Sequence, residues 1–105
     1  MLFWHKLPDL PDGLSEITIA GKKICIIHSG QKIHACSALC PHAGGTLASG
    51  YVDALGSIVC PVHHYRFSLT NGRNTSGEGY HLKMYHVEVR EDGVYIGITD
   101  AGKKD

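Results

Sequence analysis

Two short segments of the chain hold the side chains best suited to bind a metal. The first is Cys40-Pro41-His42 and the second is Cys60-Pro61-Val62-His63, with residues 43–59 between them. Each segment supplies one thiol and one imidazole, and in each a proline directly follows the cysteine. Proline fixes a backbone angle and removes a hydrogen-bond donor, so both loops are stiff before a metal arrives. Thiolates favour iron–sulfur chemistry, and two imidazoles can replace two of the four cysteines of a binuclear cluster.

A structural zinc ion is the alternative metal, because it also accepts two cysteines and two histidines. Zinc sites usually draw both cysteines from one knuckle, whereas Cys40 and Cys60 belong to separate segments. This separation favours the iron–sulfur interpretation. His64 follows His63 directly and could compete with it as a ligand, but the spacing favours His63.

The composition is that of an ordinary globular protein. The 105 residues suffice for one compact domain, residues 1–105, and are too few for two. Ten Lys and Arg balance ten Asp and Glu, so the charge provides no footprint for nucleic acid and no basic patch for an anionic membrane. Residues 1–9 contain no long apolar run, so we expect neither a signal peptide nor a membrane anchor, and a cytoplasmic location. In a reducing compartment, clustered cysteines are more often metal ligands than disulfides.

Short antiparallel strands must position the two metal-binding segments. Apolar alternation and apolar runs predict strands at residues 16–20, 22–28, 31–36, 82–90 and 94–98. Turns are predicted at Ser29-Gly30 and at Asp92-Gly93. No window has a helical period longer than about two turns. We therefore predict an all-β fold, a small sandwich or barrel, with long loops at residues 36–50 and 58–79.

The spacing Cys-x-His followed by Cys-x-x-His resembles the signature of Rieske iron–sulfur proteins. The likeness extends to Gly44-Gly45 after the first segment, and to Phe67 and Asn71-Gly72 after the second. It covers about residues 17–98, which would form the core of a single Rieske [2Fe–2S] domain. The fold that this resemblance implies is a Rieske-like antiparallel β-sandwich with a small cluster-binding subdomain made of two loops.

The resemblance also implies the roles of the four candidate ligands. Cys40 and Cys60 would bind the inner iron of one [2Fe–2S] cluster per chain, and His42 and His63 would bind the outer iron, which changes its redox state. Such a chain would be a monomeric ferredoxin that carries single electrons between a reductase and an oxygenase or other oxidoreductase, and not an enzyme. We expect no nucleic-acid or membrane partner. Two alternatives are a reductase subunit similar to the nitrite reductase small subunit, and a zinc-stabilised interaction module.

Rieske proteins of cytochrome bc complexes carry a disulfide beside the cluster and two hydroxyl groups that donate hydrogen bonds to it. The corresponding positions here are Gly45 and Val62 for the disulfide, and Tyr65 and Phe67 for the hydroxyls. Glycine and valine form no disulfide, phenylalanine donates no hydrogen bond, and tyrosine is too bulky to replace the serine. We therefore expect a potential near the low end of the Rieske range, about −150 mV.

The other two cysteines receive structural interpretations. Cys25 lies in an apolar run and is expected to be a small buried hydrophobic residue. Cys36 precedes Cys40 by four residues and is interpreted as a buried thiol beneath the cluster loop, with a disulfide or a redox switch as the alternative.

Residues 75–80 are expected to form a mobile, glycine-containing cover over the cluster. Phe3 and Trp4 are expected to plug the edge of the sheet.

Overall fold

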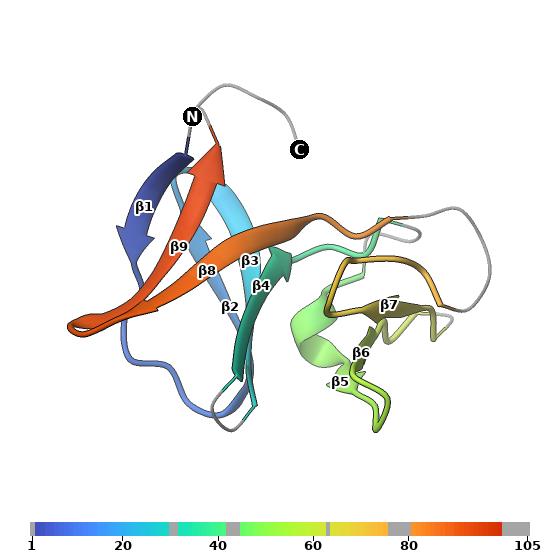
Figure 1. Cartoon of the computed structure of the whole chain (residues 1–105). Helices are drawn as coiled ribbons and strands as arrows, with labels where there is room; N and C mark the ends of the chain where they lie inside the picture. The colour runs from blue at the N-terminus through green and yellow to red at the C-terminus, as the bar shows by residue number, and fades with distance from the viewer. Residues whose placement is uncertain (1, 30–31, 42–44, 63, 76–80, 100–105) are drawn as a thin grey trace.

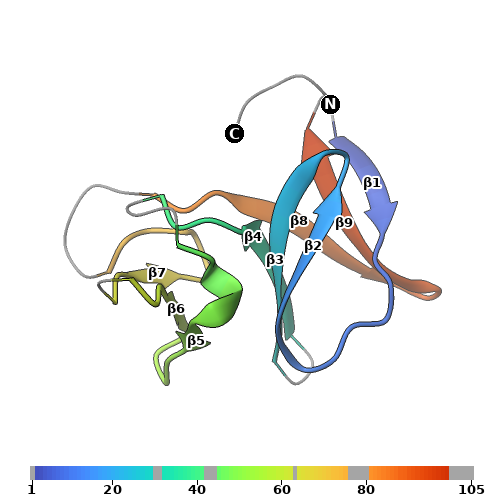
Figure 2. The same cartoon turned by 180° about the vertical axis from the view of Figure 1, so that it is seen from behind.

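The computed structural model describes residues 2–29, 32–41, 45–62, 64–75 and 81–99. The larger of its two antiparallel sheets contains, in spatial order, β1 (Leu2–Lys6), β9 (Gly93–Thr99), β8 (Met84–Arg90), β4 (Lys32–Ser37), β3 (Lys22–Ser29) and β2 (Gly13–Ile19). The smaller sheet contains β5 (Tyr51–Val52), β6 (Ser57–Val59) and β7 (Arg66–Ser68), and the 3₁₀ helix η1 (Leu47–Ser49) precedes it. Figures 1 and 2 show the smaller sheet standing beside the larger one as a separate lobe. No helix in the described ranges is long and apolar enough to cross a membrane.

The predicted all-β antiparallel fold is confirmed. The five predicted strands correspond to β2, β3, β4, β8 and β9, with ends that differ by up to three residues. One turn is displaced, because Gly93 already pairs with Arg90 and the turn itself consists of Glu91 and Asp92. In the β3–β4 hairpin, Ser29 pairs with Lys32, and residues 30–31 lie outside the described residues.

Strand β1 was not predicted, and it forms one edge of the six-stranded sheet. It pairs with β9 along its whole length, from Leu2 to Lys6. The ring of Trp4 lies over Gly97 of β9, where an added Cβ atom would come within 3.2 Å of the ring. The guanidinium group of Arg90 stands 5.2 Å from the centre of the same ring. The Trp4 ring therefore packs across the neighbouring strand and helps to hold β1 at the edge of the sheet.

Strand β3 separates two hydrophobic cores. Ile24 and Ile26 pack into the core enclosed by the curled six-stranded sheet, whereas Cys25 and Ile27 pack into the core shared with the smaller sheet. All four side chains are buried. An uninterrupted apolar run is typical of a strand that is covered on both faces. The second core, which we call the inter-sheet core, lies directly beneath the candidate site; its buried members are Cys25, Ile27, Cys36, Cys40, Leu47, Ile58, Cys60, Phe67, Leu69 and Leu82.

Candidate iron–sulfur site

The two candidate metal-binding segments form matched loops of six residues. The first loop runs from Cys40 to Gly45 and the second from Cys60 to Tyr65. The Cys40 N–H donates to the Gly45 carbonyl at 2.8 Å, and the Cys60 N–H donates to the Tyr65 carbonyl, also at 2.8 Å. Each loop is therefore closed by a hydrogen bond from the backbone of its own cysteine.

Antiparallel pairs hold the base of each loop. Leu39 and Thr46 form an isolated β-bridge on either side of the first loop. Val59 and Arg66, the last residue of β6 and the first of β7, pair on either side of the second. Because the residues before and after each loop are fixed in this way, the cysteine at each loop's start is held by regular backbone pairing.

The thiols of Cys40 and Cys60 lie in contact with each other and are buried. Their residues are 2% and 0% exposed, respectively, and neither forms a disulfide. Burial raises the pKa of Cys60, the neighbouring Cys40 raises it further, and a hydrogen bond from the backbone of Val62 opposes both effects. Cys60 is therefore a neutral thiol at neutral pH, and a metal must displace its proton on binding.

The two loops touch at Gly45 and Val62. A Cβ atom added to Gly45 would lie 2.8 Å from a Val62 methyl carbon and 3.4 Å from the Cys60 sulfur. These are the two positions at which cytochrome bc proteins carry their disulfide. Here the loops meet through a glycine and a valine side chain, without a covalent link.

The structure brings together two of the four predicted ligands and does not describe the other two. His42 and His63 lie outside the described residues, although the loops that contain them are closed at both ends. His64 is described; it is exposed, and its φ of +57° lies in the left-handed region. That region favours glycine, so His64 occupies a glycine-like backbone position in the second loop. Among the described side chains, no three His, Cys, Asp or Glu residues gather into a metal site.

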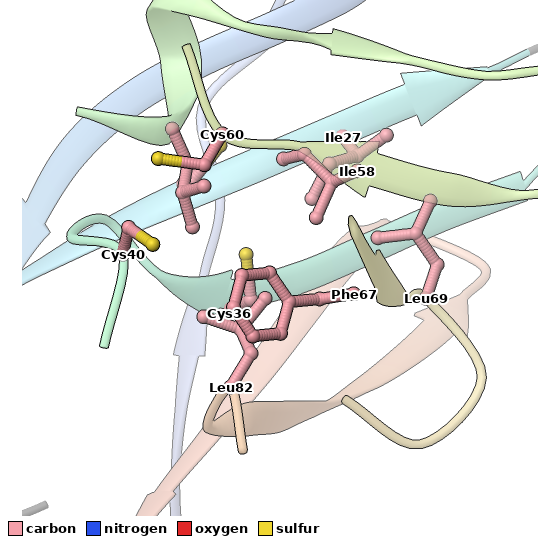
Figure 3. Close-up of a cluster of buried hydrophobic side chains, with 10 residues drawn as sticks. Ile27, Cys36, Cys40, Ile58, Cys60, Phe67, Leu69 and Leu82 are labelled. Carbon is pink, nitrogen blue, oxygen red and sulfur yellow. The ribbon is translucent and has the colours of Figure 1, made fainter. Parts of the chain in front are cut away.

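The inter-sheet core supports both loops from below. Figure 3 shows Cys40 and Cys60 at one end of this core, with Cys36 and Phe67 nearer its centre. Phe67 is fully buried, so its side chain is a packing element beneath the second loop. Tyr65 is half-buried and packs against the same core.

Gly72 and Leu82 bring two parts of the chain close together where it leaves the smaller sheet and returns to the core. We call this close backbone contact the neck. The Leu82 N–H donates to the Gly72 carbonyl at 2.8 Å. The φ of Gly72 is +79°, and a Cβ atom at this position would overlap the Leu82 carbonyl oxygen. Only glycine fits there. The predicted mobile cover follows this neck, and residues 76–80 of it lie outside the described residues.

Apolar side chains next to the cysteines remain exposed. Leu39 is 46% exposed and Val62 is 38% exposed, and the adjoining Pro41 and Pro61 are exposed as well. These four residues form what we call the apolar rim. Sequence reasoning did not single out Leu39, although an apolar residue beside a candidate ligand in a surface loop is a signal that could have done so.

Comparison with known proteins identifies the family. The family model described as the Rieske [2Fe–2S] domain matches residues 4–86. The chain belongs to this family. A Rieske domain carries a [2Fe–2S] cluster, and the two buried, free, contacting thiols of Cys40 and Cys60 suit the thiolate half of its ligand set.

Several ferredoxins resemble this Rieske domain over most of their length. The 3-phenylpropionate/cinnamic acid dioxygenase ferredoxin subunit of Photorhabdus laumondii is 26% identical over 100 residues, which cover 94% of this chain and 95% of that protein. The ferredoxin of carbazole 1,9a-dioxygenase from Nocardioides aromaticivorans IC177 has a TM-score of 0.75 at 26% identity, covering 88% of this chain and 91% of that one. A structure described as an NADH-dependent nitrite reductase small subunit from Mycobacterium tuberculosis has a TM-score of 0.82 at 16% identity, covering 95% and 98% of the two chains. At that identity the last likeness concerns the fold alone.

Proposed function

We propose that this Rieske domain is a ferredoxin that passes single electrons from a reductase to an oxygenase or a similar oxidoreductase. Its cluster would be held by Cys40 and Cys60 on one iron and by His42 and His63 on the other. The observation that carries the proposal is the matched pair of closed loops, whose cysteines meet in a buried contact. Relatives named as ferredoxin components of dioxygenase systems support it.

The protein's own residues prepare the site in three ways. The backbone hydrogen bonds within the loops orient the two cysteines toward each other. The inter-sheet core excludes water from their sulfur atoms, which are buried. Cys60 loses a proton when metal binds, because the raised pKa keeps the thiol neutral until then. When bound, the cluster supplies a centre that accepts and releases one electron.

The residues around the thiols suit a low potential. Hydrogen bonds to a cluster and its ligands tune its potential. Phe67 lies buried beneath the second loop with no group to donate, and Gly45 and Val62 provide no disulfide. We expect a midpoint of about −150 mV, the low end of the range for these centres. Such a potential favours electron delivery to an oxygenase.

We also propose that residues 1–105 form a single domain, which acts as a monomer in the cytoplasm. The apolar rim beside the two cysteines suits brief docking of a redox partner through apolar contact. The formal net charge is zero, so we expect the rate of this docking to change little with salt. Size-exclusion chromatography coupled to light scattering measures the monomer directly.

The experiment that tests the proposed function is purification under argon followed by iron, zinc and sulfide analysis. We expect a brown protein with about two irons per chain and the electron paramagnetic resonance signal of a mixed-ligand reduced [2Fe–2S] cluster. The variants Cys60→Ala and His63→Ala should lose the colour. The matched control Cys25→Ala removes a buried thiol that is not a proposed ligand, and should keep it. A colourless protein with one zinc per chain would refute the proposal.

A further inference from the structure

A second pair of cysteines lies on the face of the larger sheet that packs against the smaller one. Cys25 on β3 and Cys36 on β4 stand directly opposite each other in the antiparallel register. Both residues are 0% exposed, and both thiols are free. A hydrogen bond joins the two side chains. The protein therefore contains two reduced thiols in contact, on neighbouring strands and away from the loop interiors.

Other residues in the same register form a row across the sheet. Glu16 on β2 pairs with Cys25, and Met84 on β8 pairs with Cys36. Directly opposed residues of antiparallel strands point to the same face. Three sulfur-containing side chains thus follow one another across β3, β4 and β8, and Met84 packs against the inter-sheet core. The exposed Glu16 stands at the outer end of the row.

The geometry of directly opposed residues suits a disulfide. Their Cα atoms in an antiparallel pair are about 4.5–5.5 Å apart. Disulfides join Cα atoms about 4.4–6.8 Å apart. Since the sulfur atoms of Cys25 and Cys36 already share a hydrogen bond, a sulfur–sulfur bond requires rotation of the side chains and no change of register.

We propose that Cys25 and Cys36 form a second redox centre, a dithiol that hydrogen peroxide oxidises to a cross-strand disulfide. In the first step the Cys25 sulfur attacks one peroxide oxygen, the O–O bond breaks, and a sulfenic acid and one water form. In the second step the Cys36 sulfur attacks the Cys25 sulfur, the S–S bond forms and a second water leaves. Two electrons and two protons pass from the thiols, and one peroxide becomes two waters.

The surroundings of the pair indicate which cysteine attacks the peroxide and which one then attacks the sulfenic acid. The hydrogen bond from Cys36 lowers the pKa of Cys25, with burial and the charge of Glu16 acting in the opposite direction. The same hydrogen bond and burial raise the pKa of Cys36. Cys25 is therefore the first of the two to become a thiolate, which is the nucleophilic form. Complete burial excludes a bulky oxidant such as glutathione disulfide and restricts the reaction to a small one that enters during local opening.

The disulfide would act on the strand that leads to the cluster. Strand β4 continues from Cys36 through Ser37 to the first loop, which begins at Cys40. A bond between β3 and β4 at this point anchors the approach to the first loop.

The test uses the full chain with its metal in place. The reduced protein, freed of reductant, receives one to ten equivalents of hydrogen peroxide and is quenched in acid, alkylated and digested with trypsin. Cleavage after Lys32 places Cys25 and Cys36 on different peptides, 24–32 and 33–66, so that only a disulfide can join them. We expect the joined species in more than half of the chains, with fragmentation placing the bond at Cys36, and separation of the peptides by dithiothreitol.

Matched variants separate this inference from the proposed function. Cys36→Ala and Cys25→Ala should each abolish the joined peptides while the visible absorption of the cluster remains. Cys40→Ala should lose the absorption and keep the joined peptides. Absence of the link in the unmodified chain, sulfinic acid on Cys25 in its place, or a link from Cys25 to Cys40 or Cys60, would overturn the inference.

Discussion

At the scale of single residues, the two loops of the site meet where Gly45 faces the Val62 side chain. The methyl carbon of Val62 would lie 2.8 Å from an added Cβ atom. We expect Gly45→Ala to force the loops apart, at a cost of about 1–3 kcal/mol, because overpacking displaces neighbouring groups. Iron per chain and visible absorption should fall together.

A second substitution tests whether this contact is the cause. Val62→Ala removes the methyl groups that face Gly45, so the double variant Gly45→Ala/Val62→Ala should recover most of the iron lost by the single one. A double variant as poor in iron as Gly45→Ala alone would show that the added methyl group acts elsewhere.

His64 stores backbone strain beside a proposed ligand. Its φ of +57° costs a residue other than glycine about 1–2 kcal/mol. Glycine would relieve that strain. It would also lower the free energy of unfolding by about 0.5–1 kcal/mol, because glycine increases the conformational entropy of the unfolded chain. We therefore expect His64→Gly to change the free energy of unfolding by less than about 1 kcal/mol, whereas the β-branched His64→Val should lower it by at least about 1 kcal/mol. Urea unfolding followed by circular dichroism measures both; equal effects would contradict this account.

At the scale of elements, the turn between β2 and β3 contains an alanine at a position where the backbone angle favours asparagine. Ala20 and Gly21 form the turn, with φ values of +53° and +79°. Two successive positive angles are typical of a type I′ turn, in which Asn-Gly is strongly preferred. Ala20→Asn should raise the free energy of unfolding by about 0.5 kcal/mol, and Ala20→Val should lower it. A stability gain with valine would exclude this turn geometry.

Two glycines with similar backbone angles allow the neck of the smaller lobe to be tested. Gly72 has φ +79° and meets the Leu82 carbonyl, while Gly56 has φ +84° and faces open space. Gly56→Ala should lower the free energy of unfolding by about 1 kcal/mol, because only the backbone angle is unfavourable for alanine there. Gly72→Ala should cost clearly more and loosen the return of the chain to β8. Thermal unfolding compares the two variants, and similar midpoints would contradict a close approach at the neck.

The strands that sequence reasoning missed depend on partners far along the chain. Strand β1 has no apolar alternation of its own, and it is held by its pairing with β9, where Gly97 lies beneath the Trp4 ring. Strands β5, β6 and β7 have two or three residues each, too short to show any period. By contrast, the strands of the larger sheet that were predicted carry their own alternation or a continuous apolar run.

Register was the information that the sequence analysis lacked for the second cysteine pair. A turn at Ser29-Gly30 would place Cys25 opposite His34. The observed pairing of Ser29 with Lys32 places Cys25 opposite Cys36 instead. Since directly opposed side chains share a face, this shift decides whether the two thiols meet.

At the scale of the whole molecule, stability should decrease on the acid side because of His34. Burial lowers the pKa of this half-buried histidine, and the charge of Lys32 lowers it further. The unfolded chain therefore binds the proton first, near its ordinary pKa of about 6.5, and the folded state loses relative stability as pH falls through that value. Between pH 7.5 and 5.5 the free energy of unfolding should fall less in His34→Gln than in the original protein. His86→Gln, which alters an exposed histidine, is the control, and an equal fall in all three proteins would exclude His34 as the cause.

The ligand chemistry could be read from the sequence, but the shape of the site could not. Two cysteine–proline segments predicted paired thiols, and the structure places Cys40 and Cys60 in contact. Each loop is closed by a hydrogen bond from the cysteine amide to the carbonyl five residues later, that of Gly45 or Tyr65. The position of a backbone carbonyl is not specified by the type of its residue, so the sequence could not predict this closure. His42 and His63 remain predictions from spacing and resemblance.

The matched closure of the two loops has a consequence for protein design. Each loop begins and ends at a backbone pair and is tied across by its own cysteine amide, while its cysteine side chain packs into the inter-sheet core. To move the site into another protein, a designer would therefore have to copy the loops together with the core beneath them. Two adjacent hairpins of another scaffold would need six residues each, glycine at the position of Gly45 and an apolar core under both cysteines to present the same pair of thiols.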